Sequence, residues 1–285
     1  MRRRTHNPNP SSTDYLWIAL AAVGAFFVVR RVMQGRQTAG GLLGPGEKKD
    51  GVTVYTEADL PQVDFNPQSV LSRNPRFASE RMADRAYAIQ KLGGKVVDPS
   101  TYPYTLAGFQ AFLDASGVNR QWSSARELAK MNKPAIGAKY GYTLFLPPQV
   151  WWPKAAALAL LQNRLREMLG EPVVINNWWR PKGYNEDAGV GGAPRGDHPD
   201  GDALDLNLRS ERSKWRAVDY LYKLQQAEPT LAVSLGVYSS AGTIHAGLQS
   251  ANGKRTWDYS KPKDAHARIT RSVIDEGLRR SGAVA

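Results

Sequence analysis

Residues 191–208 read GGAPRGDHPDGDALDLNL, and the last six of them alternate in polarity. Alternation of this kind predicts a β-strand over residues 203–208 that buries its three leucines and turns Asp205 to the opposite face. The glycines ahead of the strand allow the loop that carries His198 to fold back over the strand end. The stretch therefore predicts a histidine and an aspartate near one end of a sheet.

A second alternating stretch, TIHAGL at residues 243–248, places His245 on the non-core face of another strand. If the two strands pair, His198, Asp205 and His245 come within reach of one ion and leave a fourth position for water, as in catalytic zinc sites. The chain has no cysteine, so a thiolate site is excluded. A surface or hydrogen-bonded role for each histidine remains the alternative. A calcium loop around Asp200 is disfavoured, because the calcium-loop order of acids and its final glutamate are missing.

The expected order of elements from Pro153 onward is helix, strand, loop, strand, helix, strand, strand, helix. This order predicts an α+β domain over residues 141–285, with a small mixed or antiparallel sheet and flanking helices. Residues 76–140 are predicted to form a helical subdomain. Its helix-start signals are Thr105, as a helix N-cap, and a capping box from Ser124 to Glu127.

The N-terminal 33 residues are predicted to be a basic segment followed by one membrane-spanning helix. The run from Tyr15 to Val29 carries no charge, and no small-residue cleavage site precedes Arg30, which favours an uncleaved anchor over a signal peptide. Arginines flank the run on both sides, so the positive-inside rule does not set its orientation. Residues 34–75, rich in Gly, Pro and charge, are predicted to be a flexible linker. The expected location of the C-terminal domain is the periplasm or cell wall.

The 285-residue chain is 42% hydrophobic and 22% charged, which suits a packed core, and its formal net charge is +12. A basic chain favours an anionic partner such as nucleic acid, phospholipid or a cell-wall polymer. No basic run is interleaved with aromatic residues, so no specific nucleic-acid partner is expected. The sequence makes no prediction of the oligomeric state.

The segment HPDGDALD, residues 198–205, matches the pattern H-x-x-G-x-A-x-D and resembles the D-alanyl-D-alanine carboxypeptidase-like zinc peptidases, which cut peptidoglycan stem peptides. Upstream, NNWWRPKGYN and GGAPRGDH resemble the arginine turn and the segment before the first histidine of that family. Downstream, GVY and GTIH resemble a strand of that family, and RTW at residues 255–257 resembles its closing R-x-W motif. The resemblance covers roughly residues 145–260, with these short matches in the family's order.

The resemblance implies that His198, Asp205 and His245 bind Zn²⁺, and that Arg180 binds a carboxylate or carbonyl of the substrate. It also implies that the substrate is a peptidoglycan peptide and that the protein is a cell-wall hydrolase. With the predicted N-terminal anchor, such a protein is expected in a bacterial envelope, where the helix binds it to the membrane, or in a phage particle. The metal would activate water and polarise the scissile amide.

The chain departs from the family where the catalytic carboxylate is expected, either two residues after the last histidine or three before it. These positions hold Gly247 and Gly242, and glycine has no group that could act as a general base. Gly196 also replaces the family's serine. The acids that lie near the motifs in sequence are Asp187, Asp200, Asp202 and Asp258. The general base is therefore unknown, and two functions remain open: an active zinc peptidase, or a catalytically degraded member that acts as a cell-wall-binding or structural module.

Overall fold

The computed structural model describes residues 47–49, 52–54, 85–139, 144–147, 149–193, 196–238, 242–250, 253–259 and 268–283. The predicted membrane anchor, residues 1–33, lies outside them. Among the described residues, no helix has both the length and the apolar character that a membrane span requires. Two short strands, β1 (Glu47–Lys49) and β2 (Val52–Val54), fall within the predicted linker and form a three-strand sheet with β3 (Phe145–Leu146).

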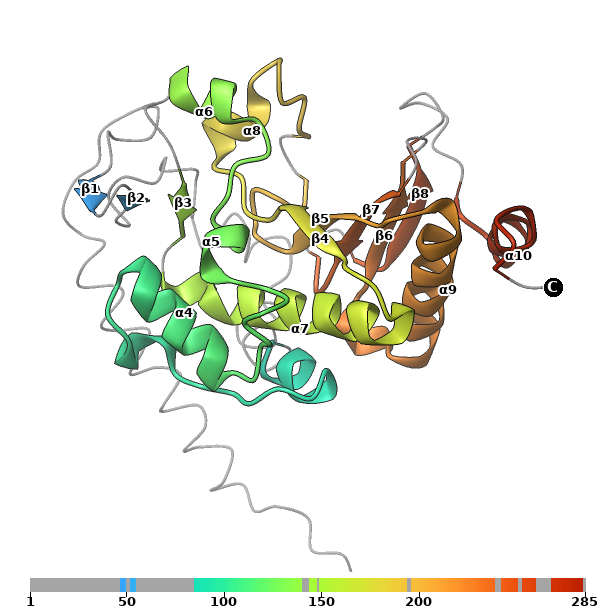
Figure 1. The fold of residues 1–285 in the computed structure, drawn as a ribbon, viewed down its shortest axis with the longest axis horizontal. Helices are drawn as coiled ribbons and strands as arrows, with labels where there is room; N and C mark the ends of the chain where they lie inside the picture. Colours follow the sequence, from blue (N-terminus) through green and yellow to red (C-terminus); the bar gives the residue numbers. More distant parts are fainter. Residues whose placement is uncertain are drawn as a thin grey trace, which may run out of the picture. The chain divides into compact units, whose positions relative to one another are not determined.

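A five-strand mixed sheet forms the centre of the domain, and its order is β4-β5-β7-β6-β8. Its strands are β4 (Val174–Asn177), β5 (Ala203–Asn207), β6 (Ser234–Val237), β7 (Thr243–Gly247) and β8 (Arg255–Asp258). All neighbours are antiparallel except β6 and β8, which run parallel. The predicted α+β fold with a mixed sheet is confirmed, although β8 was not predicted as a strand (Figure 1).

The two faces of the sheet differ as the alternation in the sequence predicts. Leu204 pairs with Ala246, and Leu206 pairs with Ile244, and all four side chains belong to the hydrophobic core. The residues between them turn to the other face, where Asp205 is the direct partner of His245. This second face is covered as well, because both polar side chains are buried.

Three long helices complete the C-terminal part: α7 (Trp152–Leu169), α9 (Glu211–Ala227) and α10 (Arg271–Arg280). Helix α7 has a proline in its first turn and ends at Gly170, whose φ of 70° suits a residue without a side chain. Helix α9 packs against β6 and β7, and α10 lies on the outer side of α9 (Figure 1). Apolar side chains of all three helices belong to the same core as the leucines of β5.

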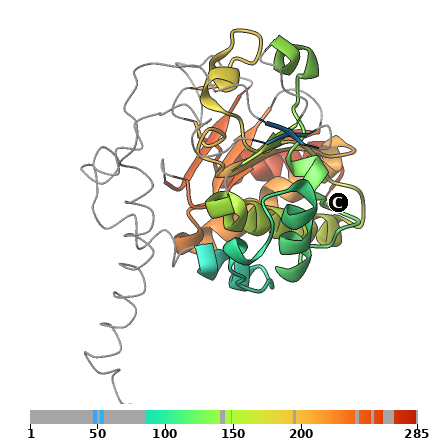
Figure 2. The same cartoon turned by 90° about the vertical axis from the view of Figure 1, so that its left-hand side faces the viewer.

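The predicted helical region contains α4 (Leu106–Ala115), α5 (Ala125–Leu128) and α6 (Pro134–Lys139). As predicted, Thr105 caps α4 and Ser124 caps α5, since each side chain accepts a hydrogen bond from a backbone N–H of the first turn. Glu127 Oε1 accepts a bond of 3.1 Å from the backbone N–H of Ile175, which ties α5 to the edge strand β4. In the view of Figure 2, α4 and α7 lie below the orange strands, whereas α6 lies near the top of the picture. Four further short helical segments are η1 (Pro99–Thr101), η2 (Gln149–Trp151), α8 (Lys182–Glu186) and η3 (Pro229–Leu231), and residues 85–91 are helical as well.

Three neutral polar residues join α7 to the helical region, and we call Ser123, Gln162 and Asn163 the amide cluster. Gln162 Oε1 accepts bonds from Ser123 Oγ (2.6 Å) and Asn163 Nδ2 (2.7 Å), while Gln162 Nε2 donates to the Val173 and Trp122 carbonyls. Asn163 Oδ1 accepts from the backbone N–H of Asn119. No polar side-chain atom of the cluster is buried without a partner, so the cluster is complete in itself.

Candidate metal centre

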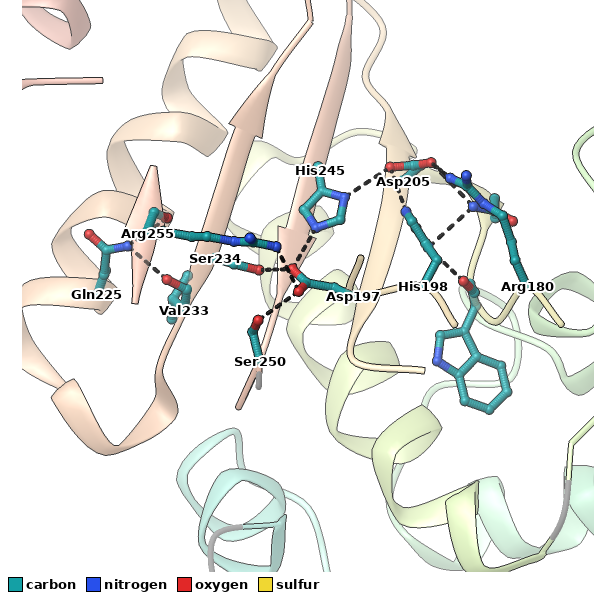
Figure 3. Close-up of polar contacts among 12 residues, drawn as sticks. Arg180, Asp197, His198, Asp205, Gln225, Val233, Ser234, His245, Ser250 and Arg255 are labelled. Atoms are coloured by element: carbon teal, nitrogen blue, oxygen red, sulfur yellow. Dashed lines mark hydrogen bonds and ion pairs between the residues drawn. The ribbon is translucent and has the colours of Figure 1, made fainter. Parts of the chain in front are cut away.

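The three predicted ligands converge on one buried point beside β5 and β7 (Figure 3). Asp205 Oδ1 lies 3.1 Å from His198 Nε2 and 3.3 Å from His245 Nδ1. The imidazole rings are perpendicular, and their centroids are 5.0 Å apart. One donor atom from each residue lies within 4.8 Å of the other two, and all three residues are buried. Pairing of β5 with β7 and the return of the glycine-rich loop thus bring the residues together as predicted.

The ring of His198 is held in one tautomer by the backbone. Its Nδ1 lies 2.6 Å from the Trp178 carbonyl, which only accepts, so Nδ1 carries the proton and donates. The amide nitrogen of Asn177 is farther from Nδ1, at 3.3 Å. Nε2 is buried and has no hydrogen-bond partner, although Asp205 Oδ1 lies 3.1 Å away. Burial lowers the pKa of His198, so the free Nε2 keeps its lone pair near neutral pH.

Asp205 uses its two oxygens differently. Arg180 Nη2 lies 2.6 Å from Oδ2, and Asn177 Nδ2 donates to the same oxygen at 3.2 Å, helped by an irregular register in β4 that sets Asn177 opposite Asp205. Oδ1 faces the two histidines and the Tyr238 hydroxyl, 3.4 Å away. Burial would raise the pKa of Asp205, but His198, His245 and Arg180 hold it well below its ordinary value. The carboxylate therefore presents one charged oxygen to the centre.

Arg180 was predicted to bind substrate, and in this structure its guanidinium binds Asp205. The side chain is buried, and its Nε has no hydrogen-bond partner. Its Nη1 lies 3.4 Å from Asn185 Oδ1, and its backbone N–H donates to the His198 carbonyl. The observed contacts make Arg180 a support for one predicted ligand, and its contact with substrate stays a prediction.

His245 lies between two carboxylates, one on each side of its ring. Nδ1 faces Asp205, and Nε2 lies 3.1 Å from Asp197 Oδ2. Burial alone would lower the pKa of His245, but the hydrogen bonds to Asp197 and Asp205 outweigh burial and raise it. Asp197 is not among the site residues predicted from the sequence, although it directly precedes His198 and is one of the few buried acids of the chain.

Aromatic side chains cover the face of the sheet beside His245. The Trp257 ring lies 5.0 Å from the His245 ring, and Tyr238 stacks on Tyr259 at 4.2 Å. A Cβ atom at Gly236, the β6 partner of both His245 and Trp257, would lie 2.7 Å from Trp257 and Tyr259 atoms. The missing side chain is thus what allows these half-buried rings to lie across β6.

Neither glycine at the family's carboxylate positions has space for a side chain. A Cβ atom at Gly247 would lie 2.1 Å from Ser234 Oγ and 2.9 Å from the Asp202 carbonyl. At Gly242, where φ is +80°, it would lie 2.2 Å from the Leu208 carbonyl. The local packing therefore excludes an acidic side chain at both positions.

None of the four nearby acids named from the sequence joins the cluster of three ligands in the described part of the chain. Asp202 instead pairs with Lys154, with 2.6 Å between Oδ1 and Nζ, and both side chains are buried. Asp187 accepts a hydrogen bond from the backbone N–H of Gly189. The general base stays unidentified.

The donor set fits a zinc ion. Two ligands that bind zinc tetrahedrally at 2.0–2.1 Å are about 3.3 Å apart. The separations of 3.1 and 3.3 Å from Asp205 Oδ1 agree with this value. Two imidazole nitrogens and one carboxylate oxygen are also a donor set that zinc accepts. The unpartnered Nε2 of His198 is the buried atom that such an ion would satisfy.

A mixed sheet with two histidines and an aspartate meeting at a buried centre defines a metallopeptidase-like domain. The family model described as Peptidase M15 matches residues 111–246, and this part of the chain belongs to the peptidase M15 family. The resemblance found in the sequence is confirmed, and the match begins earlier than residue 145, inside α4. No curated protein and no solved structure matches the chain.

Proposed function

We propose that the domain is a zinc-dependent peptidase that cleaves peptidoglycan stem peptides. The observation that carries the proposal is the convergence of two histidines and one aspartate in a member of a peptidase family, with His198 Nε2 and His245 Nδ1 at 3.1 and 3.3 Å from Asp205 Oδ1. These three atoms would hold the ion. A bound zinc ion supplies Lewis-acid polarisation of a peptide carbonyl and activation of a water molecule.

The surrounding residues have separate tasks in this proposal. Arg180 orients Asp205 through a buried ion pair, so that Oδ1 stays directed at the centre. Tyr238 lies beside Oδ1, and burial raises its pKa, so its hydroxyl keeps its proton and serves as a hydrogen-bond donor to a peptide oxygen. Trp257 and Tyr259 supply an aromatic wall for the substrate. The net charge of +12 favours an anionic cell-wall polymer.

A second function has support in one specific observation. Gly247 and Gly242 remove the family's carboxylate, and the packing at both positions leaves no room to replace it. A site that holds zinc but lacks a general base would bind cell-wall peptides without cleaving them. The proposed location, in a bacterial envelope or a phage particle, is the same for both functions.

One experiment separates the two functions. The chain is loaded with zinc, incubated with purified sacculi and with muropeptides, and the products are analysed by mass spectrometry. The matched control is His245→Ala, which removes one proposed ligand. A new peptide product that disappears on chelation and in the control supports the peptidase. Zinc-dependent sacculus binding without a product supports the module. Absence of both binding and cleavage would reject both functions.

A further inference from the structure

The proposed chemistry does not use the carboxylate of Asp197, which is buried beside His245. Its side chain has no exposed surface. Oδ2 accepts from Ser234 Oγ at 2.7 Å and from His245 Nε2 at 3.1 Å, and Oδ1 accepts from Ser250 Oγ at 2.6 Å and from Arg255 Nη2 at 2.7 Å (Figure 3). Four donors from four separate residues therefore converge on one carboxylate.

Asp197 is not the missing general base. It contacts Nε2 of His245, while the ring nitrogen directed at Asp205 is Nδ1, on the other side of the imidazole. Its four hydrogen bonds also fill the acceptor positions of both oxygens. A group in this position acts on the ring of His245 and not on a substrate.

We propose that Asp197 is a positioning residue that fixes which nitrogen of His245 binds the metal, an inference that rests on the proposed zinc site. A carboxylate only accepts hydrogen bonds, so Nε2 must carry a proton to bond to Asp197, whereas Nδ1 faces the proposed ligand Asp205 and is the nitrogen whose proton a cation would displace. With its proton held on Nε2, the ring of His245 offers only Nδ1 to a cation. A carboxylate behind a ligating histidine orients the ring and makes it a stronger ligand.

Different partners thus fix opposite tautomers of the two histidines. The Trp178 carbonyl holds the proton of His198 on Nδ1 and leaves Nε2 for the ion, whereas Asp197 holds the proton of His245 on Nε2 and leaves Nδ1. The partner of His245 is charged, and the partner of His198 is neutral. Arg255 offsets the charge of Asp197, and its guanidinium lies over the Trp257 ring at 4.7 Å. Two residues of β8 thus hold Asp197 in place beside His245.

The direct test uses the unaltered chain with ¹⁵N-labelled histidine. Long-range ¹H–¹⁵N correlation spectra should show a proton on Nε2 of His245 both without and with zinc, and a proton on Nδ1 of His198 as the opposite internal reference. An Nε2 of His245 that carries no proton in either form overturns the inference. If the chain binds no zinc at all, the proposed function fails, while the metal-free spectrum still decides the role of Asp197.

The second test is Asp197→Asn, which keeps the shape of the side chain. An amide cannot accept from both His245 and Arg255 on its two ends, so the ring loses its fixed tautomer. Zinc affinity, measured by competition with a chromophoric chelator, should fall about 10–100-fold, which is the usual cost of losing such a partner. The matched control is Asp202→Asn, a buried acid of the same loop that pairs with Lys154 and contacts no proposed ligand. It should change zinc affinity less than about twofold.

The outcomes are distinct. Weaker binding in Asp197→Asn alone, with both variants folded by circular dichroism, supports the proposal. Equal affinity in Asp197→Asn and the unaltered chain overturns it, as does an equal loss in both variants, which would mean that the loop needs its buried charges only for folding. If Asp197→Asn does not fold, the spectra of the unaltered chain decide.

Discussion

Two buried polar clusters in the described part of the chain differ in whether they are complete. The amide cluster of Ser123, Gln162 and Asn163 is neutral, and none of its buried side-chain atoms lacks a partner. The cluster of His198, Asp205 and His245 is ionisable, and one of its nitrogens is buried without a hydrogen bond. Both lie among apolar side chains, and both join segments far apart in the sequence.

The difference shows how a structural polar cluster can be told from a binding site. Burying polar groups is tolerated when every group has its partner, and costs about 1–3 kcal/mol when one is left over. The amide cluster meets this condition by itself and serves stability. The histidine cluster has one nitrogen left over, and its three donor atoms also converge on one point, so the two features together indicate a ligand.

The largest effect is expected when a proposed zinc ligand is removed. His198→Ala and His245→Ala should each weaken zinc binding by more than about 100-fold, because a direct ligand matters more than an outer partner. Stability of the metal-free chain should also fall, by about 1–3 kcal/mol, because His198→Ala leaves the Trp178 carbonyl and His245→Ala leaves the Asp197 and Asp205 carboxylates without a buried partner. Isothermal titration calorimetry and thermal melting measure the two quantities. Zinc binding that survives either substitution would place the ion elsewhere.

The converse change is Gln162→Leu in the amide cluster. It leaves the Val173 and Trp122 carbonyls without this donor and the Ser123 hydroxyl without its acceptor, and should lower the free energy of unfolding by about 3 kcal/mol. Zinc affinity of the folded fraction should not change. Urea denaturation of the metal-free chain measures the loss. A variant as stable as the unaltered chain would show that the cluster contributes specificity rather than stability.

The pH dependence of metal binding should separate the clusters further. The pKa of His245 is raised, so the metal-free ring holds a proton on both nitrogens to above its ordinary pKa of 6.5. Zinc must displace the Nδ1 proton, so affinity should fall about tenfold for each pH unit below that raised pKa and should still increase with pH above 6.5. Chelator competition over a pH series measures this slope. A constant affinity across the series would contradict the assigned ligand.

The smallest effect is expected for Ser123→Ala. Asn163 Nδ2 donates to both Ser123 Oγ and Gln162 Oε1, so one bond remains after the hydroxyl is lost. The expected loss is about 1 kcal/mol in the free energy of unfolding, with unchanged zinc affinity. Together with Gln162→Leu, this variant should give two different losses of unfolding free energy within one cluster. A larger loss for Ser123→Ala than for Gln162→Leu would reverse the assigned order of importance.

The parts of the site that lie on regular strands could be predicted from the sequence. The alternation in residues 203–208 and 243–248 sets the face of each side chain, so these two stretches are enough to match Asp205 with His245. The supports of the site could not be predicted in this way. Asp197 meets His245 across 48 positions of sequence, and no periodicity connects a loop residue to the far side of a ring.

Strand β8 was missed for a related reason. Its four residues, RTWD, begin and end with charge and do not show a clear alternation of polar and apolar types. It is defined by pairing with β6, a tertiary effect that outweighs local preference. The lack of space for a side chain at Gly247 could not be predicted either. The geometry of a strand would allow an acid there, and it is the tertiary fold that brings Ser234 Oγ close to this position.

Strand β8 has a consequence for the order of assembly. It is the last strand along the chain and pairs with β6, so β6 separates it from β7, and it contributes Arg255 to Asp197. The peptidase M15 match ends at residue 246, before this strand begins. During synthesis, all three proposed ligands therefore leave the ribosome before the arginine that secures their support. The contacts that hold the ring of His245 are therefore complete only after Arg255 has also been synthesised and β8 has paired with β6.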